Sequence, residues 1–289
     1  MLASETAILP VAWRVEFHES SDAIPDGVDT IEVLEPRTVT ALLIPMEPSD
    51  ALAQAHPQAT GALTVIWMPQ EVNTPATIER DVDEWTRRAD SVRKEVNVRA
   101  DVRNLRVVWG ESRSVIYANE GDLRFALDAV IRFSVAQGEA LALESAMRST
   151  WNTIEADTAL THALTMADLK RQNHVNQMTE FATRLKMTWL RIFRTLDQLD
   201  PPLTEQSKRV FAELVSAASL HDRMETLENP IQFALDHYEI SNTRLIDMYL
   251  ARTDRVNSIY GYGILIILLL IQTWLMLVEG GWIHFSIRT

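Results

Sequence analysis

The feature that most constrains this chain is the stretch from Ile259 to Val278, in which no residue carries a charge. About twenty residues in an α-helix span about 30 Å, which matches the hydrocarbon thickness of a bilayer. The middle of the stretch is rich in Ile and Leu, and aromatic residues stand near both ends, as they do at membrane–water interfaces. The sequence therefore predicts a single transmembrane helix over residues 258–279 and a short outer tail over residues 280–289.

Basic residues beside this stretch predict its direction across the membrane. Arg252 and Arg255 precede it, whereas only Arg288 follows it, and basic residues are in excess on the cytoplasmic side of membrane proteins. The first residues of the chain lack the basic and apolar segments of a secretory signal. We therefore expect a tail-anchored, single-pass protein of the cell inner membrane, with a cytoplasmic N-terminal domain and the lipid bilayer as a partner.

The triplet Gly261-Tyr262-Gly263 at the head of the stretch also lines potassium-channel filters. Such a filter needs a re-entrant loop packed between two spanning helices, whereas here the triplet enters a single helix directly. We interpret Gly261 and Gly263 as small residues at which neighbouring helices approach closely. The amide of Gln272, inside the stretch, either pairs with a polar group of another helix or lies near enough to the interface to be hydrated.

Residues 1–120 predict an α+β domain rich in antiparallel strands. A helix is expected from the Thr74-Pro75 start signal to Val96, because apolar residues repeat there at helical spacing. Runs of alternating or compact apolar residues predict strands, of which the last two form a hairpin; the strands are expected at residues 11–17, 31–34, 38–44, 61–69, 105–110 and 114–118.

Residues 121–257 predict a long-helix bundle or coiled-coil stalk. The pattern is helical over 123–199 and over 203–228, and a third helix starts near Ile231 and continues without a break into the membrane. Asp200-Pro201-Pro202 and Asn229-Pro230 are expected to separate the three helices. In the first helix, apolar residues three or four apart predict a seam for another copy or a partner; they are Met178, Phe181, Leu185, Trp189, Ile192 and Leu196.

Composition excludes several classes of function. The net charge of −13 disfavours nucleic acid as a partner, and a chain without cysteine has neither disulfides nor thiol chemistry. No phosphate-binding loop, dinucleotide fingerprint or nucleophile elbow is present. His221 and Glu225 lie one helical turn apart, but zinc requires three or four protein ligands. We therefore predict no catalytic residues, no metal site and no cofactor.

Several short motifs, in their order and spacing, resemble the tail-anchored "required for meiotic nuclear division" family over the last two thirds of the chain. The family has a strand, helical segments, a proline break and one C-terminal span in this order; the similar segments are Val107-Val108-Trp109-Gly110, Leu143-Glu144, Thr153-Ile154-Glu155, His162-Ala163-Leu164, Leu199-Asp200-Pro201-Pro202 and Arg223-Met224-Glu225-Thr226-Leu227. The resemblance implies an oligomeric scaffold fixed to a membrane, without assigned catalysis; the mitochondrial branch supports translation at the inner membrane.

The architecture also resembles CorA-type metal channels more loosely, because an acidic α/β domain precedes a long helix that enters the membrane. Those channels need two spans and a Gly-Met-Asn loop, and the sequence contains neither. Our expectation is a non-enzymatic oligomeric scaffold, or a partner-binding subunit of a membrane complex, that forms homo-oligomers or binds a membrane protein. The alternatives are an oligomeric channel or membrane effector whose single spans form a pore, and a membrane-bound enzyme.

Overall fold

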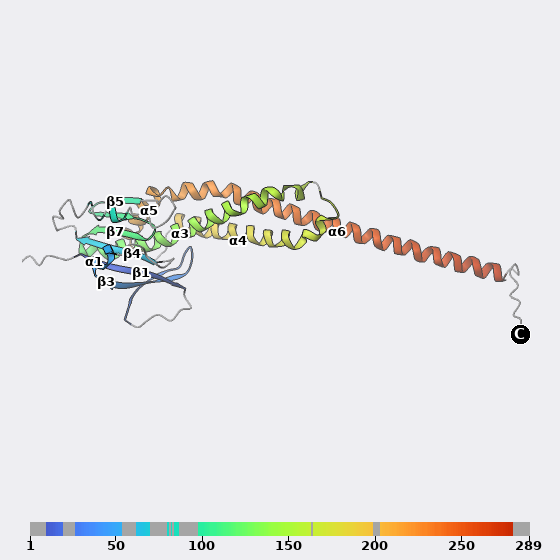
Figure 1. Ribbon diagram of the computed structural model, residues 1–289, viewed down its shortest axis with the longest axis horizontal. Helices are drawn as coiled ribbons and strands as arrows, with labels where there is room; N and C mark the ends of the chain where they lie inside the picture. Colours follow the sequence, from blue (N-terminus) through green and yellow to red (C-terminus); the bar gives the residue numbers. More distant parts are fainter. Residues whose placement is uncertain are drawn as a thin grey trace, which may run out of the picture. The chain divides into compact units, whose positions relative to one another are not determined.

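The structure is a computed structural model that describes residues 10–19, 27–53, 62–69, 80, 82, 84–86, 98–162, 164–198 and 203–279. The chain separates into two units. The first contains Met1–Trp151 and Thr183–Phe233, and the second contains Asn152–Ala182 and Ala234–Thr289. An N-terminal sheet domain is followed by long helices, the last of which is apolar toward its C-terminal end, as the sequence predicts (Figure 1).

The first unit is built on a seven-stranded sheet with the order β2-β3-β1-β4-β7-β6-β5. Neighbouring strands are antiparallel except for β4 and β7, which are parallel. The strands at the six predicted positions are present, and β5 is an additional one. Their bounds are β1 Val11–Glu19, β2 Asp29–Val33, β3 Val39–Met46, β4 Ala62–Pro69, β5 Val98–Val102, β6 Leu105–Trp109 and β7 Arg113–Ala118.

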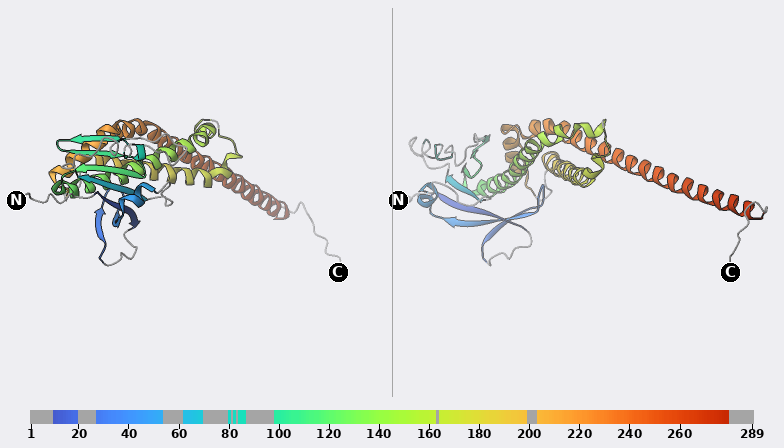
Figure 2. Two further views of the ribbon diagram at one scale, coloured as in Figure 1. Left: turned by 60° about the vertical axis from the view of Figure 1, so that its left-hand side comes forward. Right: turned by 45° about the vertical axis from the view of Figure 1, so that its right-hand side comes forward.

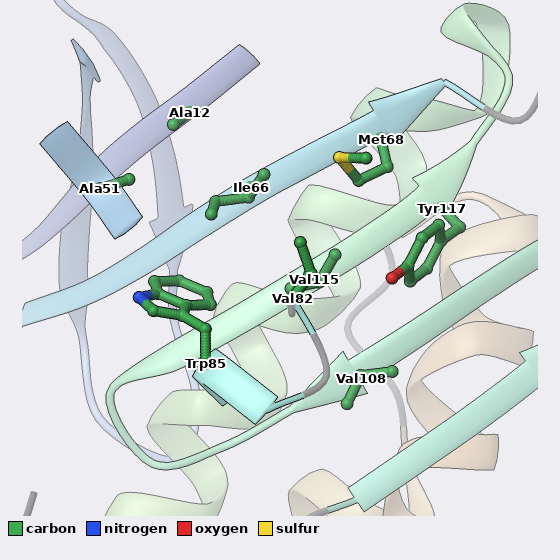
Figure 3. Packing of buried hydrophobic residues seen from close by; sticks show 9 residues of the cluster. All are labelled: Ala12, Ala51, Ile66, Met68, Val82, Trp85, Val108, Val115 and Tyr117. Atoms are coloured by element: carbon green, nitrogen blue, oxygen red, sulfur yellow. The ribbon is translucent and has the colours of Figure 1, made fainter. Parts of the chain in front are cut away.

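Helical segments cover one face of the sheet, where a short helix α1 (Pro48–Ala53) and the helical residues 84–86 pack on the central strands (Figure 3). Strand side chains alternate between faces, so every second residue of β4, β6 and β7 contributes to this layer. Most of the helix predicted over residues 74–96 lies outside the described residues. The buried cluster consists of Ala12, Ala51, Ile66, Met68, Val82, Trp85, Val108, Val115 and Tyr117.

Gly110, which follows β6, permits a close approach at the edge of this layer. A Cβ atom at Gly110 would lie 3.1 Å from the carbonyl oxygen of Thr86 and 3.3 Å from that of Arg113. Backbone atoms cannot yield as a flexible side chain can, so a larger residue would separate the segments. The guanidinium of Arg113, which is buried, donates to the carbonyl oxygen of Trp85 at 3.0 Å and secures the same junction.

The other face of the sheet packs against the long helix α3 (Glu120–Ala156). Trp109 follows Val108 on β6 and points to this opposite face. Its indole nitrogen donates to the Ser134 hydroxyl at 2.8 Å, and its ring meets Phe133 edge-on at 4.9 Å. Phe133 in turn contacts Phe211 of α5 (Glu205–Ala217). Because both faces of the sheet are covered, β4 and β7 are buried almost throughout rather than at every second residue.

An ion pair fastens α3 to the beginning of α6 (Leu220–Glu279) within the first unit. The Arg223 guanidinium donates to the Glu144 carboxylate through Nε at 2.8 Å and contacts it through Nη2 at 2.6 Å. A third nitrogen donates to the side-chain oxygen of buried Gln137 at 3.2 Å. Glu144 and Arg223 both belong to the motifs that carry the family resemblance, and here they serve as partners in packing.

The helix boundaries differ from the sequence prediction in three places. The helix expected over residues 123–199 is interrupted: α3 ends at Ala156, two short 3-10 turns follow, and α4 covers Gln172–Asp197. The helix expected over 203–228 is interrupted at Ser219, whose φ is +48°. The break expected at Asn229-Pro230 is absent, because α6 runs through Pro230. A proline inside a helix costs about 3 kcal/mol, and α6 is packed on both sides of it, with Met224 and Ile231 buried.

In the second unit, the connection between α3 and α4 lies beside the middle of α6, and α6 then continues alone (Figures 1 and 2). The last buried residue among those described on α6 is Leu245. From Ile246 to Leu277 the side chains are exposed, apart from the half-buried Met248 and Gly263. The uninterrupted course from residue 231 into the apolar stretch agrees with the sequence prediction.

Candidate membrane anchor and buried polar cluster

The C-terminal part of α6 carries the longest apolar surface that the structure describes. It is the one helix, within the described residues, that is long and apolar enough to cross a membrane, and none of its apolar window is buried. Every large apolar side chain from Ile259 to Leu277 is exposed. Soluble proteins rarely expose an apolar surface of this extent unless another molecule covers it.

The three residues predicted to pack membrane helices all lie on this surface. A Cβ atom added to Gly261 or Gly263 would meet nothing within 4 Å, and Gln272 is exposed. Nothing in the part of the chain that the structure describes therefore fills the space beside the two glycines. The tyrosine between the two glycines, Tyr262, is 70% exposed and lies within regular helix rather than in a re-entrant loop.

The seam predicted on α4 is largely occupied by the chain itself. Leu185, Trp189 and Ile192 are buried, and the remaining three, Met178, Phe181 and Leu196, are half-buried. The indole nitrogen of Trp189 donates to the carbonyl oxygen of Met224 on α6 at 2.7 Å. The buried part of the stripe on α4 therefore packs within the chain, and most of the exposed large apolar residues lie on α6.

A buried carboxylate joins three segments of the second unit at the end of α3. The Asp157 side chain is 2% exposed and accepts hydrogen bonds from three donors. His174 Nε2 on α4 lies 2.7 Å from one carboxylate oxygen, and the Tyr238 hydroxyl on α6 donates to the same oxygen at 2.9 Å. Arg171, just before α4, donates to the other oxygen. We call Asp157, Arg171, His174 and Tyr238 the Asp157 cluster.

The charge of Asp157 is stabilised where it is buried. Burial by itself raises the pKa of this carboxyl, but the hydrogen bonds from His174 and Tyr238 and the charges of His174 and Arg171 outweigh it and lower the pKa. Burial, together with the hydrogen bond to Asp157 and the charge of that carboxylate, raises the pKa of Tyr238, so its hydroxyl remains a donor. His237 lies beside the cluster; burial lowers its pKa, although the charge and the backbone of Asp157 act in the opposite direction.

Local side-chain hydrogen bonds explain why the helix ends at this carboxylate although no Gly or Pro is present. Thr158 returns a hydrogen bond to the carbonyl oxygen of Glu155 at 2.8 Å, and Thr161 does the same to Thr158 at 2.9 Å. The Asp168 carboxylate then accepts from the backbone and hydroxyl of Thr165 at 2.8 and 2.6 Å. Such contacts compete with helical hydrogen bonds, and they turn the chain so that Arg171 and His174 face Asp157.

The arrangement fastens α6 rather than opening a reaction site. Three donors occupy the two oxygens of Asp157, and the side chain is almost inaccessible to solvent. A second polar contact, from the Gln172 amide to the Asn242 oxygen at 2.6 Å, joins the start of α4 to α6 close by. Sequence reasoning missed the cluster because its members are 14, 17 and 81 positions from Asp157 and form no local pattern.

The pair His221 and Glu225 is not assembled into a metal site. The His221 ring lies 4.0 Å from the Asp197 carboxylate and stacks beside Phe193 at 5.0 Å. Across the part of the chain that the structure describes, no three His, Asp or Glu side chains gather to hold a metal ion. A cavity of about 290 Å³ beside His221 is open to solvent, and Phe211 is among its lining residues.

Comparisons with known proteins find similarity among solved structures. No protein-family model matches the chain, and no curated protein sequence matches it. Among solved structures, the chain is similar to the full-length CmaX protein, at 11% sequence identity and a TM-score of 0.33. That alignment covers 92% of this chain and 89% of the CmaX chain.

Proposed function

We propose that this protein is a single-pass protein of the inner membrane and acts as a non-enzymatic scaffold or partner-binding subunit. Its N-terminal sheet domain lies in the cytoplasm, and the C-terminal part of α6 is the anchor. The observation that carries the proposal is the apolar surface from Ile259 to Leu277, which no part of the chain covers within the described residues.

Insertion into a bilayer is the favourable way to remove this surface from water. The stretch from Ile259 to Val278 contains eleven Ile and Leu residues. At about 0.3–0.6 kcal/mol for each, their insertion contributes about 3–7 kcal/mol. The backbone of the stretch is helical throughout, so its amide groups are satisfied in hydrocarbon as they are in water.

The charges on either side support a cytoplasmic N-terminal domain. Arg252 and Arg255 lie within two turns of the stretch on its N-terminal side, and basic residues close to a span set its orientation. The scaffold part of the proposal is supported by the two polar contacts that fasten the middle of α6, at Asp157 and at Asn242. Because these contacts fasten α6 to the start of α4, the mostly exposed residues 246–277 extend in a fixed direction from the fastened part of the helix.

Alkaline extraction of isolated membranes tests the anchor. We expect the wild-type chain to stay in the membrane pellet. The double variant Leu268→Arg with Ile271→Arg should leave it, because each arginine at the centre of a span costs about 2.5–3.5 kcal/mol and together they cancel the gain. Ser258→Arg places the same charge just before the stretch and should remain in the pellet. Extraction of the wild-type chain into the supernatant would refute the anchor.

Single cysteines test the orientation, since the natural chain has none. Leu34→Cys introduces a thiol at an exposed position of the sheet domain, and Ser286→Cys introduces one in the C-terminal tail. A membrane-impermeant maleimide should label only Ser286→Cys from the outer side of the membrane, and both variants after lysis. Labelling of Leu34→Cys from the outer side would show that the proposed orientation is wrong.

A further inference from the structure

The exposed portion of α6 before the anchor has a regular apolar stripe that no other described segment covers. From Ile246 onward, alternating steps of three and four residues select mainly apolar positions, and these positions continue into the anchor without a change of phase. They are Ile246, Tyr249, Thr253, Val256, Tyr260, Gly263, Ile267, Leu270, Trp274 and Leu277. In the anchor nearly every position is apolar, so the informative part is the charged stretch of residues 246–258.

Within the described residues, no other segment of the chain covers this stretch. Residues 246–258 are exposed except for the half-buried Met248, and at 1.5 Å per residue they extend for about 20 Å. Because most helical stability in proteins comes from packing of an amphipathic face, a partner on the stripe would stabilise this part of α6. A spacing of three and four residues repeats every 3.5 on average, which is the period that keeps one face of a helix against another helix.

The positions of the charged residues in this stretch are compatible with pairing against a second copy of the chain. With Ile246 as the first position of a heptad, Asp247 and Asp254 both take the second position, which points away from the stripe. A chain with a net charge of −13 should repel its own copies, yet the stripe and its flanks contain no carboxylate. Arg252 flanks the stripe at a position where a parallel copy would present Asn257, so like charges do not meet.

We propose that residues 246–263 form a parallel, in-register coiled coil with a second copy of this chain. The inference rests on the proposed function, because the anchor makes every copy enter the same membrane in the same direction and at the same residue. In a parallel symmetric assembly each residue of the stripe then faces its own copy. Gly263, which has open space beside it, lets the backbones approach where the stripe enters the membrane.

Cysteine cross-linking in native membranes tests the proposal on the full chain. Single variants Tyr249→Cys, Thr253→Cys and Val256→Cys place a thiol on the stripe, whereas Ala251→Cys and Ser258→Cys place one on the opposite side of the same helix. A disulfide needs Cβ atoms about 4 Å apart. Mild oxidation should therefore give covalent dimers at the three stripe positions, on the order of tenfold more than at the two control positions.

A second set of variants distinguishes cross-links formed by pairing along the stripe from those formed by random collisions in the membrane. Adding Val256→Asp to Thr253→Cys should remove most of the dimer, because it places a carboxylate on the stripe, whereas adding Asp254→Ala should leave the dimer unchanged. Equal cross-linking at all five positions, a product of a mass other than twice the chain, or no product from protein in the membrane pellet would each overturn the proposal. Protein found outside the pellet would instead refute the anchor itself.

Discussion

Replacing Tyr238 with Phe isolates the contribution of one hydrogen bond in the Asp157 cluster. The ring of Tyr238 is fully buried and the substitution preserves it, so only the hydroxyl that donates to Asp157 at 2.9 Å is lost. A hydrogen bond to a charged group contributes about 1.5–3 kcal/mol. Asp157 retains His174 and Arg171, both more than one third exposed, so solvent compensates in part and we expect about 1.5–2 kcal/mol.

The unfolding temperature of the full chain in detergent, followed by tryptophan fluorescence, measures this loss. For a protein of this size a change of 2 kcal/mol corresponds to about 4–8 °C. Tyr262→Phe is the matched control on the same helix, because Tyr262 is 70% exposed and lies off the stripe; it should remain within about 0.5 kcal/mol of the wild-type chain. If Tyr238→Phe were as stable as Tyr262→Phe, the Asp157 cluster would not fasten α6.

Two further predictions concern pH and the α4 stripe. Burial lowers the pKa of His237 below its usual 6.5, so the stability that its neutral ring allows is present above that pH and is lost as the pH falls through the folded pKa. The unfolding temperature of the wild-type chain should fall between pH 7 and 5, and that of His237→Gln should fall less over the same range. Ile192→Ala removes a fully buried side chain and should cost about 2–5 kcal/mol without changing the mass of the assembly, whereas Leu190→Ala, 46% exposed, should cost under about 0.5 kcal/mol.

The strands and the last helix could be predicted because their signals are local. The apolar run at residues 61–69 lies between Gly and Pro and is buried on both faces, and it became β4. The absence of Gly and Pro from residue 231 to Gly261 correctly predicted an unbroken helix. The strand β5 was missed because its apolar residues, Val98, Ala100 and Val102, alternate over only five positions.

The helix ends were predicted poorly, because side chains and packing decide them rather than Gly and Pro alone. Pro230 lies inside α6, where buried neighbours compensate for the hydrogen bond that it cannot make. Ser219 ends a helix with a φ of +48°, a conformation usually left to Gly. At the end of α3, hydroxyl groups such as that of Thr158 replace the missing breakers.

Only one of the two candidate sites, the apolar end of α6, could be predicted from the sequence. The long apolar end of α6 follows from hydropathy, which needs no tertiary information. The Asp157 cluster depends on a turn that places Arg171 and His174 opposite Tyr238, and no spacing rule connects these residues before the turn is known. The α4 stripe was recognised as a packing surface, but periodicity alone does not distinguish a surface that meets its own chain from one that meets another copy.

Because α6 is unbroken beyond Asn242, only some insertions and deletions in this part of the helix preserve the direction of the residues that follow. Each residue added to a helix turns everything after it by about 100° and advances it by about 1.5 Å. An insertion of one residue between Leu245 and Ile259 would turn Gly261 and Gly263 by about 100° around the helix axis. An insertion of seven residues would return them nearly to their original direction. Variants that keep their function should therefore gain or lose residues here in multiples of seven, because seven residues complete nearly two helical turns.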